Sequence, residues 1–504
     1  MKDHEELYVC LHAKEFPAQS VLRLRPEPGE KPCAVMEGEP PLEQVCSLNG
    51  KARRLGVVRG MTRVEMEMFP SVILLSRSKP EESSTRMALL ESAGNFTPRV
   101  EEASSEIAFL CVLDIAGTEK LFGPAAKLAE TLLQHVKALG ITASIAISKN
   151  FHAAICLARG MASSATVAFI PAGEESEALA PLPLSVLTLS EDHAEILSLW
   201  GIFTLGMLAA LPERELIARL GQEGKRLRQL ARGELPHLFE PIDPPHKLEE
   251  YRELDSPVEI LEPLLFVIGA MLEQLIVRAN MRAQALASLT IQLWMESGAS
   301  HTRTVRPALP TNDRQLWIKL LHLDLEAHPP QAAIVSLTLT AEPGSTSKVQ
   351  MGLFSPQLPE PGRLDVTLAR IRAIVGEECA GRAMLRDSNK PGEFRMEPFA
   401  IPTPHGAEIF CARPRTALRQ LRPPEIVTVM LHNERPIAFF LKKKRYVVEK
   451  SYGPWLTNGD WWNPEFWSLE QWDLVAHSAD GTLLCGCLVR DQIQSCWEMV
   501  ALYD

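Results

Sequence analysis

The residues that could bind a metal ion or a nucleotide stand in short segments far apart along this chain. Cys10 and His12 lie two residues apart in the apolar run Tyr8-Val-Cys-Leu-His-Ala13, and Glu106 precedes a second apolar run. Magnesium prefers charged oxygen ligands, and two-metal chemistry needs several carboxylates that clamp both ions. A thiol and an imidazole do not supply them. The acidic residues of these two segments are Glu106 and, at the far end of the second run, Asp114.

Cysteines suggest no metal site either. Cys485, Cys487 and Cys496 lie close together, but their spacing lacks the paired C-x₂-C knuckles of a zinc site. We interpret them as small buried residues. Ten cysteines in 504 residues are too few for a disulfide scaffold and suit a reducing compartment.

Phosphate-binding candidates lie near the middle of the chain. Residues 199–209 have the form of a helix–hairpin–helix, in which Gly201 and Gly206 would let backbone N–H groups meet a DNA phosphate. The alternative is a tight turn between two packed helices. A cationic helix follows and predicts further phosphate contact, or else a solvated face, through Lys225, Arg226, Arg228 and Arg232.

Two further basic groups fall on expected strands. Arg303 and Arg306 alternate with Thr302, Thr304 and Val305, so a strand would give both a shared outward component, and we predict phosphate contact there. The run Lys442 to Arg445 is interpreted as a solvated strand edge, with DNA contact as the alternative.

The surrounding pattern predicts an α/β sheet split by an insertion. An apolar strand near residues 7–11 precedes a loop-rich stretch and a polar link at 81–85; a regular strand and helix alternation begins near 106. The expected order is strand 107–114, helix 125–139, strand 141–147, helix 151–161 and strand 166–170.

The second half predicts helices first and mixed elements later. A linker at 171–183 precedes helices at 192–199, 205–211 and 213–232. Another boundary at 240–246 precedes a long helix at 261–283 among strands at 288–294 and 333–340, and a linker at 342–362 follows. Six of the nine tryptophans fall between Trp455 and Trp497, which marks the tail as distinct.

Three segments together resemble the catalytic core of Y-family (DinB/UmuC-like) DNA polymerases. The family's finger signature, A-R-x-x-G-V-x-x-G-M, resembles Lys51-Ala-Arg-Arg-Leu-Gly-Val-Val-Arg-Gly-Met61. Val100-Glu-Glu-Ala-Ser104 resembles the start of the palm segment V-E-x-x-S-I-D-E-A, and Gly140 to Asn150 resembles G-[IL]-T-x-S-x-G-I-[AS]-x-N-K. Their order makes a chance match unexpected, and the resemblance covers residues 5 to 340.

The resemblance implies a metal site whose acids are missing here. The family has one Asp on its first strand, where Cys10 stands with His12 in the neighbouring position. Its Asp-Glu pair on a later strand corresponds to Glu106 and Ile107 in one register, or to Phe109 and Leu110 in the other. Neither register restores a carboxylate pair. The resemblance therefore implies a polymerase fold without cofactors, with Mg²⁺ needed only if other ligands replace those lost.

Nucleotide contacts implied by the family are also reduced. Arg53 matches an arginine that contacts the incoming triphosphate, but Gly50 stands in place of its aromatic companion. A simple surface charge is the alternative for Arg53. The family's Lys-Pro-x-Gly segment is missing, and Arg159-Gly160 or Ala162 stands in that region.

The family's right-hand architecture predicts the domain boundaries. It implies a palm with a split ferredoxin-like α/β sheet, a fingers domain, a helical thumb with a helix–hairpin–helix, an α/β little finger and a C-terminal extension. We expect palm at 1–12 and 86–178, fingers at 13–85, thumb at 179–245, little finger at 246–346, linker at 347–362 and a partner-binding extension at 363–504.

The linker and the tail carry two further resemblances. Gln350-Met-Gly-Leu-Phe354 matches the bacterial sliding-clamp-binding pentapeptide, in which Leu353 and Phe354 would enter an apolar groove and Gln350 a polar pocket. An ordinary linker is the alternative. The tail, with Thr457 to Trp462, resembles that of ImuB-type proteins, described as inactive Y-family relatives that bring an error-prone replicative-type polymerase and a RecA-like accessory protein to the clamp. Its tryptophans are interface anchors, the core of a small β-rich domain, or both.

Composition sets the remaining limits. Net charge of −11 argues against a uniformly basic nucleic-acid binder, although local phosphate contacts decide affinity. No signal peptide or sufficiently long apolar run is evident, so we expect a cytoplasmic protein without membrane contact.

The main hypothesis is a non-catalytic adaptor for damage-tolerant DNA synthesis that binds primer–template or damaged DNA. The alternatives are an active polymerase with displaced ligands, such as Glu106 and Asp114, and a DNA-binding repair protein without clamp contact.

Overall fold

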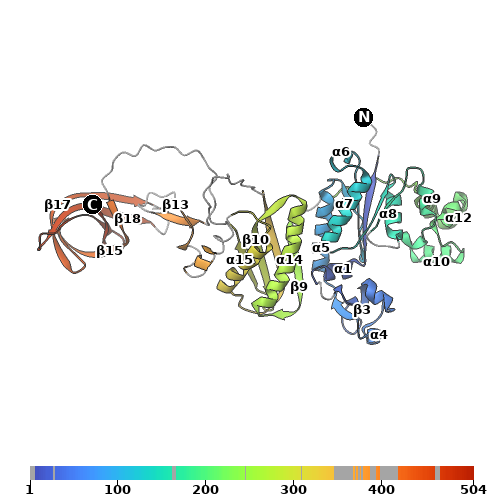
Figure 1. Cartoon of the computed structure of the whole chain (residues 1–504), viewed down its shortest axis with the longest axis horizontal. Coiled ribbons are helices and arrows are strands. Elements are labelled where there is room, and N and C mark those ends of the chain that lie inside the picture. Colours follow the sequence, from blue (N-terminus) through green and yellow to red (C-terminus); the bar gives the residue numbers. More distant parts are fainter. Residues whose placement is uncertain are drawn as a thin grey trace, which may run out of the picture. The chain divides into compact units, whose positions relative to one another are not determined.

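The computed structural model divides the chain into two compact units, residues 1–373 and 374–504 (Figure 1). Described residues are 6–25, 29–161, 166–243, 246–307, 309–345, 367–368, 370–372, 375, 379–385, 393–397, 418–459, 462 and 466–503. The first unit contains the region that resembles a polymerase. The second contains the tryptophan-rich tail.

A mixed five-stranded sheet forms the palm-like part of the first unit, in the order β5-β6-β1-β7-β8. The pairs β5–β6, β6–β1 and β1–β7 are antiparallel, and β7–β8 is parallel. This confirms the predicted split α/β sheet. Its elements are β1 (Tyr8–Lys14), β5 (Val100–Glu102), β6 (Ala108–Asp114), β7 (Ser144–Ser148), β8 (Val167–Phe169), α5 (Lys79–Gly94), α6 (Glu119–Phe122), α7 (Ala125–Ala138) and α8 (Phe151–Gly160).

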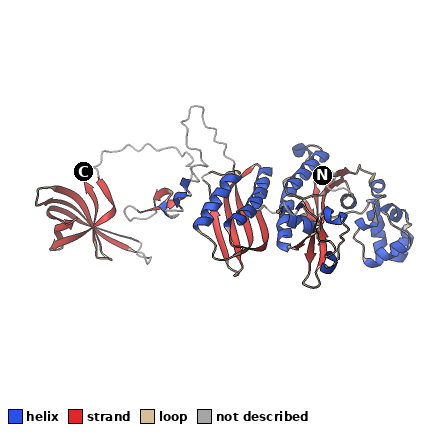
Figure 2. Ribbon diagram, turned by 60° about the horizontal axis from the view of Figure 1, so that its bottom comes forward, coloured by secondary structure: helices blue, strands red, loops and turns tan. Residues whose placement is uncertain are grey.

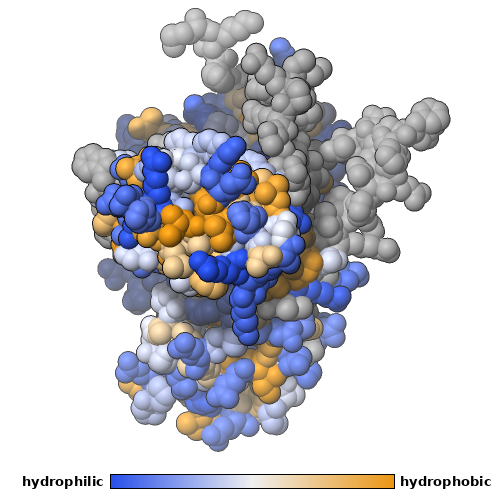
Figure 3. Space-filling view, turned by 90° about the vertical axis from the view of Figure 1, so that its left-hand side faces the viewer, coloured by the Kyte–Doolittle hydropathy of each residue, from blue (hydrophilic) through white to orange (hydrophobic). Residues whose placement is uncertain are grey.

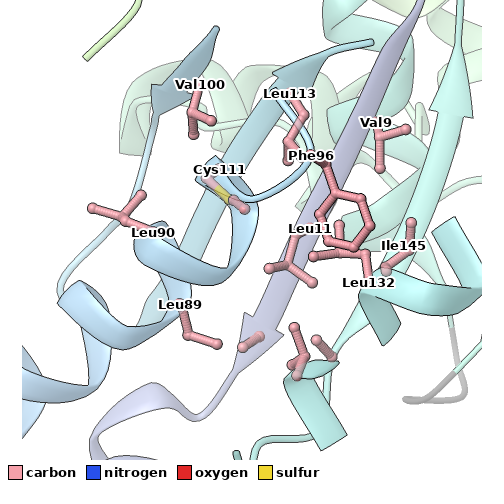
Figure 4. Packing of buried hydrophobic residues seen from close by; sticks show 14 of the residues in the cluster. Val9, Leu11, Leu89, Leu90, Phe96, Val100, Cys111, Leu113, Leu132 and Ile145 are labelled. Carbon is pink, nitrogen blue, oxygen red and sulfur yellow. The ribbon is translucent and has the colours of Figure 1, made fainter. Parts of the chain in front are cut away.

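Alternation along β1 assigns its side chains to two faces. Val9 and Leu11 enter a core shared with α5 and α7, where Leu89, Leu90 and Leu132 also lie (Figure 4). Cys10 instead packs in a separate core with residues of α8. Because successive strand residues point to opposite faces, this central strand is apolar on both sides.

The fingers-like part is inserted after α1 (Phe16–Arg23). It has a three-stranded sheet in the order β3-β2-β4 and two short helices, so the stretch expected to be loop-rich is more regular than predicted. Glu81 to Thr85, expected as a polar link, lie inside α5, where most of them are buried against neighbouring elements. The elements are β2 (Cys33–Glu37), β3 (Gln44–Leu48), α3 (Gly50–Arg54), α4 (Arg63–Met66) and β4 (Ile73–Ser76).

A helical thumb-like part follows. The expected linker at 171–183 contains a short helix, and the expected helix at 213–232 is divided in two at Gly221, whose φ of +65° interrupts it. The elements are α9 (Glu175–Leu179), the 3₁₀ turn η1 (Leu184–Val186), α10 (Glu191–Leu199), α11 (Leu205–Ala210), α12 (Glu213–Leu220) and α13 (Gln222–Arg232).

Two helices pack on a four-stranded sheet in the little-finger-like part, in the order β11-β10-β12-β9 (Figure 2). Helix α14 is long and apolar enough to cross a membrane by length and composition alone. Ile268, Leu272 and Leu275 on it are completely buried in the core of this part, which explains its hydropathy. The elements are β9 (Leu248–Val258), α14 (Leu261–Met281), β10 (Gln284–Met295), β11 (Ser300–Val305), α15 (Arg314–Ala327) and β12 (Ile334–Ser345).

A network of buried charges joins the palm-like helices to the little-finger-like part. Glu250 of β9 is completely buried and accepts hydrogen bonds from Arg23 of α1 and, at 2.9 Å, from Arg278 of α14. Arg278 also binds Glu91 of α5 through Nε at 2.9 Å. Alongside, Arg25 binds Glu81 at 2.7 Å, and the same carboxylate accepts the Glu253 N–H. We call these residues the interface network.

The second unit is dominated by a closed barrel of six antiparallel strands, β15 to β20 in chain order. Trp472 and Trp467 are buried in it, and the Trp472 indole donates to Glu470 at 2.8 Å. The tryptophans therefore serve partly as core, as one of the two interpretations predicts. The elements are β13 (Arg382–Leu385), β14 (Phe394–Glu397), β15 (Leu418–His432), β16 (Arg435–Leu441), β17 (Lys444–Gly459), β18 (Trp467–Ser478), β19 (Leu483–Asp491) and β20 (Trp497–Tyr503).

Candidate nucleotide and nucleic-acid cleft

A cleft of about 990 Å³ lies where the palm-like, fingers-like and thumb-like parts meet. The end of β1 and the turn before β6 form one side of it. The fingers segment 53–59, Arg159 of α8 and residues 185–189 complete the lining. The first unit thus has a hollow at the position where a right-hand polymerase fold would place its reacting groups.

His12 lines this cleft, whereas Cys10 does not. Both belong to the same face of β1, but Cys10 is completely buried beneath α8 and burial raises the pKa of its thiol. His12 is 6% exposed, and its Nδ1 lies 3.3 Å from the Ala158 carbonyl oxygen. Burial lowers the pKa of His12 to about 4, so the imidazole is neutral near pH 7. Neither side chain supplies the negative charge of an aspartate.

The partner strand adds no charge opposite His12. Leu110 of β6 pairs with His12 in the register of the two strands and also lines the cleft. Phe109 points to the other face, where its ring lies 5.6 Å from that of Phe16. In the register that equates Phe109 and Leu110 with the Asp-Glu pair, both positions are therefore buried and apolar.

The other register leads to the turn before β6. Glu106 and Ile107 both line the cleft there, and Glu106 is 83% exposed at its side chain. Its carboxylate lies 3.8 Å from Arg77 and 4.0 Å from Lys79. The acid that remains is thus solvated and faces two cations.

Asp114 cannot complete a metal site with Glu106. It lies at the opposite end of β6, where it binds Arg99 at 2.8 Å. Seven strand residues separate the two ends by about 20 Å, because a strand rises about 3.3 Å per residue. Two ions that act on one phosphoryl group are only about 4 Å apart.

Glu15 is the acid that the sequence interpretation missed in the cleft. It precedes α1 in a left-handed conformation with φ of +53°. Its carboxylate accepts hydrogen bonds from the Ser47 hydroxyl at 2.8 Å and the Leu48 N–H at 3.1 Å, and it binds Arg53 and Arg59. Glu15 therefore holds the fingers to the palm-like strand. No local motif signals this, since its partners come from residues 47–59.

Cations are the more numerous charges of the lining. Arg53, predicted to contact a triphosphate, does line the cleft, and its side chain is 58% exposed beside Glu15. Lys14 donates to the Met161 carbonyl at 2.9 Å, and Arg159 donates to the Val186 carbonyl at 3.2 Å. With Arg59, four cations face two carboxylates, those of Glu15 and Glu106. Such a surface favours an anionic ligand.

These side chains do not fit the two magnesium ions that the fold family uses. Among the residues that the structure describes, no three His, Cys, Asp or Glu side chains gather where a metal could be held. Glu15 is already bound by two arginines and two further donors. Glu106 has two cations near it and belongs to no such cluster of metal-binding side chains. Hard divalent cations need several oxygen ligands in one place.

The glycines of the expected helix–hairpin–helix serve packing and turning. Gly206 donates its N–H to the Ala180 carbonyl at 3.0 Å, and a Cβ there would lie 2.9 Å from that of Ala180. Gly201 adopts φ of +74° and donates to the Ser198 carbonyl at 2.9 Å. Both N–H groups therefore bind carbonyl groups of the chain itself, and phosphate contact by this hairpin stays a prediction. The tight turn between packed helices fits these contacts.

The cationic helix α13 is neutralised from within the thumb-like part. Arg226 binds Glu223 at 2.7 Å, and Lys225 and Arg228 both approach Glu213, at 3.7 Å and 3.4 Å. The Arg228 Nε also donates to the Leu211 carbonyl. Arg232 binds Glu234 at 2.8 Å. Phosphate contact by these residues would have to displace those acids.

The same holds for the two cations predicted in the little-finger-like part. Arg303 binds Asp324 of α15 at 2.7 Å with its side chain 21% exposed, and Arg306 lies 3.3 Å from Glu342. The acids come from other elements, so sequence spacing did not reveal them. The predicted clamp residues Gln350, Leu353 and Phe354 lie outside the described residues.

Comparisons with known proteins agree with the palm-like fold. Residues 11–159 match the impB/mucB/samB family. The chain is 32% identical over 219 residues to DNA polymerase IV of Dehalococcoides mccartyi (strain CBDB1), which covers 42% of this chain and 54% of that protein. This chain therefore matches only about half the length of that relative.

A second relative extends further. Protein ImuB of Caulobacter vibrioides is 23% identical over 406 residues, which covers 79% of this chain and 86% of that protein. Among solved structures, DinB from Sulfolobus solfataricus aligns with 67% of this chain at 19% identity and a TM-score of 0.41. The family match and the ImuB relative lead to one conclusion: residues 11–159 of this chain resemble the impB/mucB/samB family, and most of the chain is similar to Protein ImuB.

Proposed function

We propose that this protein is a non-catalytic adaptor in translesion DNA synthesis and damage-induced mutagenesis. The observation that carries the proposal is the pairing of His12 with Leu110 at the cleft. Both strands that would carry metal-binding carboxylates are uncharged there. Of the remaining cleft acids, Glu15 binds two arginines of the fingers-like part. Glu106 lies near one cation just before α5 and one in its first turn.

DNA binding is supported by the charge of the cleft. Lys14, Arg53, Arg59 and Arg159 make its lining cationic although the chain as a whole is acidic. Primer–template DNA, damaged or not, is the ligand that we propose. The paired cations of the thumb-like and little-finger-like parts contribute less, because their acids compete with phosphate.

Partner recruitment completes the proposed role. Gln350, Leu353 and Phe354 would dock the protein on the sliding clamp by peptide capture. The second unit would recruit an error-prone replicative-type polymerase and a RecA-like accessory protein. The similarity to ImuB over most of both chains supports this assignment. We propose a cytoplasmic location, where such partners would be met.

Primer extension tests the absence of catalysis. The full chain is incubated with a primed template, all four nucleotides and either Mg²⁺ or Mn²⁺, beside an active DNA polymerase IV. We expect no extension, while fluorescence anisotropy shows binding of the same DNA. Robust extension that Glu106→Ala abolishes would establish the active-polymerase alternative instead.

Clamp recruitment has a separate test. Purified clamp is captured with the full chain and with a Leu353→Ala/Phe354→Ala variant. Loss of capture by the variant is expected, with DNA affinity retained. Undiminished capture would contradict the peptide assignment and favour a DNA-binding repair protein without this clamp contact.

A further inference from the structure

The charges of the barrel are divided between its two halves. Residues 418–451, which include β15, β16 and the first part of β17, contain eight basic and three acidic residues. Residues 452–504 contain one basic and eight acidic residues. Because β15, β16 and β17 are neighbours in the closed barrel, the cations are concentrated on one side of it.

Aromatic side chains lie exposed on this side. Tyr452 and Trp455 of β17 are 54% and 47% exposed, and Phe440 of β16 is 40% exposed. By contrast, Tyr446 of β17 and Phe439 of β16 are buried and stacked on each other inside the barrel. The exposed rings are therefore not required by the core. Figure 3 shows apolar patches among hydrophilic side chains on the face of the chain turned toward the viewer.

Cations accompany these rings in the strand register. Arg445 pairs with Phe440, and Lys450 lies two positions before Tyr452 on β17. Within the part of the barrel that the structure describes, Lys443, Arg445 and Lys450 make no ion pair, whereas Lys442 binds Glu425 at 2.6 Å. An acid also lies near: Asp473 is paired with Tyr452 in the ladder, and its side chain hydrogen-bonds to Tyr503 and Cys487.

We propose that this surface, defined by Phe440, Lys443, Arg445, Lys450, Tyr452 and Trp455, binds single-stranded nucleic acid. Exposed rings stack on unpaired bases, and free cations beside them meet the phosphates. A duplex hides its base faces, so it could use the cations alone. The proposal is independent of the function proposed for the cleft.

An acidic protein segment is the competing occupant. It would satisfy the cations but has no row of flat rings to stack on Phe440, Tyr452 and Trp455. Exposed rings combined with cations on one surface are what single-strand-binding proteins use. We therefore commit to nucleic acid and use an acidic polypeptide as a competitor.

The test measures binding of fluorescein-labelled dT12 to the full chain by anisotropy at fixed salt. We expect Tyr452→Ala/Trp455→Ala to weaken dT12 binding at least about ten-fold, while duplex affinity changes less. Lys443→Gln/Arg445→Gln/Lys450→Gln should weaken both ligands and flatten the salt dependence. Leu483→Ala, an exposed site in the acidic half, is the matched control and should bind as wild type.

Ultraviolet cross-linking of dT12 locates the site even if the aromatic variant fails to fold. Cross-links in the peptides that contain Tyr452 or Trp455 are expected in the wild-type chain. Cross-links confined to residues before 374, or unchanged dT12 affinity in a folded variant, would overturn the proposal. Displacement of dT12 by poly-L-glutamate as effectively as by unlabelled dT12 would also overturn it, in favour of an acidic protein partner.

Discussion

The two faces of the palm-like sheet differ in the charges that lie against them. On the cleft face, β1 presents Cys10 and His12, both uncharged near pH 7, and β6 presents Leu110. Behind the opposite face, α5 buries Glu81 and Glu91, each of which binds an arginine. This sheet therefore has carboxylates behind one face, where arginines pair with them, and none on the parts of β1 and β6 that face the cleft.

This difference shows that the uncharged cleft face of the sheet does not reflect a general exclusion of buried charge. The interface network keeps Glu250 and Arg278 in almost complete burial. Removing one member of such a network leaves its partner charged and desolvated. Beneath α8, Cys10 lies in an apolar core, and the effect of burial on its pKa is larger than that of the charge of Arg159.

The largest expected effect comes from restoring a carboxylate to β1. Cys10→Asp should lower the free energy of unfolding by about 4 kcal/mol at pH 7, because a fully buried carboxyl shifts its pKa by about 3 to 5 units and pH 7 lies about 3 units above the unfolded value. The aspartate pKa is raised in the folded state, so the loss grows as pH rises from about 4. Urea unfolding at several pH values measures it.

Cys10→Asn is the matched control, since it adds a polar group of similar size without a charge. A pH-independent difference between the two variants would contradict the account of this face. A Cys10→Asp variant as stable as the wild type at pH 7 would contradict it too.

The interface network should be nearly as sensitive. Glu250→Ala leaves Arg23 and Arg278 without their shared carboxylate, so we expect a loss of about 3 to 5 kcal/mol in unfolding free energy. Burial, followed by the nearby Arg278, already lowers the pKa of Arg23 to about 9. Limited proteolysis of the connection near residues 232–247 should accelerate in parallel. Unchanged stability would show that the network is dispensable.

The burial of His12 on the cleft face predicts a pH dependence of the unfolding free energy. Its folded pKa of about 4 lies below the usual value of 6.5, so the unfolded chain takes up the proton first as pH falls. Stability should decrease between about pH 6.5 and 4, by about 3 kcal/mol in total from this residue. His12→Gln should remove that part of the slope, measured as the difference between variant and wild-type urea midpoints.

His152 titrates in the same window, because burial and then His237 lower its pKa to about 4. His152→Gln therefore serves as a second comparison. If His12→Gln leaves the slope between pH 6.5 and 4 as it was, the imidazole is not neutral and buried as described.

The smallest effect is expected next to Glu250 on the same strand. Glu249 pairs with Lys247 at 2.6 Å, and the lysine side chain is 61% exposed. Glu249→Ala should cost about 1 kcal/mol or less, since exposed ion pairs contribute little. A loss as large as that of Glu250→Ala would mean that burial does not decide the difference between these neighbours.

Sequence periodicity predicted the palm-like part well. Most elements from β6 to α8 agree with expectation within a few residues, because each buries a face with a regular apolar repeat. It failed at Glu81 to Thr85, where polar residues form a buried part of α5 because their partners, such as Arg25 and Tyr251, come from distant segments. Local polarity carried no sign of those partners.

The candidate site was predicted in part. The cleft is indeed lined by His12, Arg53, Glu106 and Ile107. Cys10, two residues before His12 on β1, is instead buried in a core and does not reach the cleft. Glu15 escaped notice, because its role depends on the insertion that returns Arg53 and Arg59 to it. Spacing alone also could not show that acids neutralise Arg228 and Arg303.

Metal binding itself tests the central claim most directly. Electron paramagnetic resonance measures free Mn²⁺ in a mixture of the full chain, primer–template DNA and a non-hydrolysable nucleotide, against the same mixture without the chain. The account predicts no additional tightly bound Mn²⁺ in the presence of the chain. Two additional ions per chain, lost in Glu106→Gln, would contradict it.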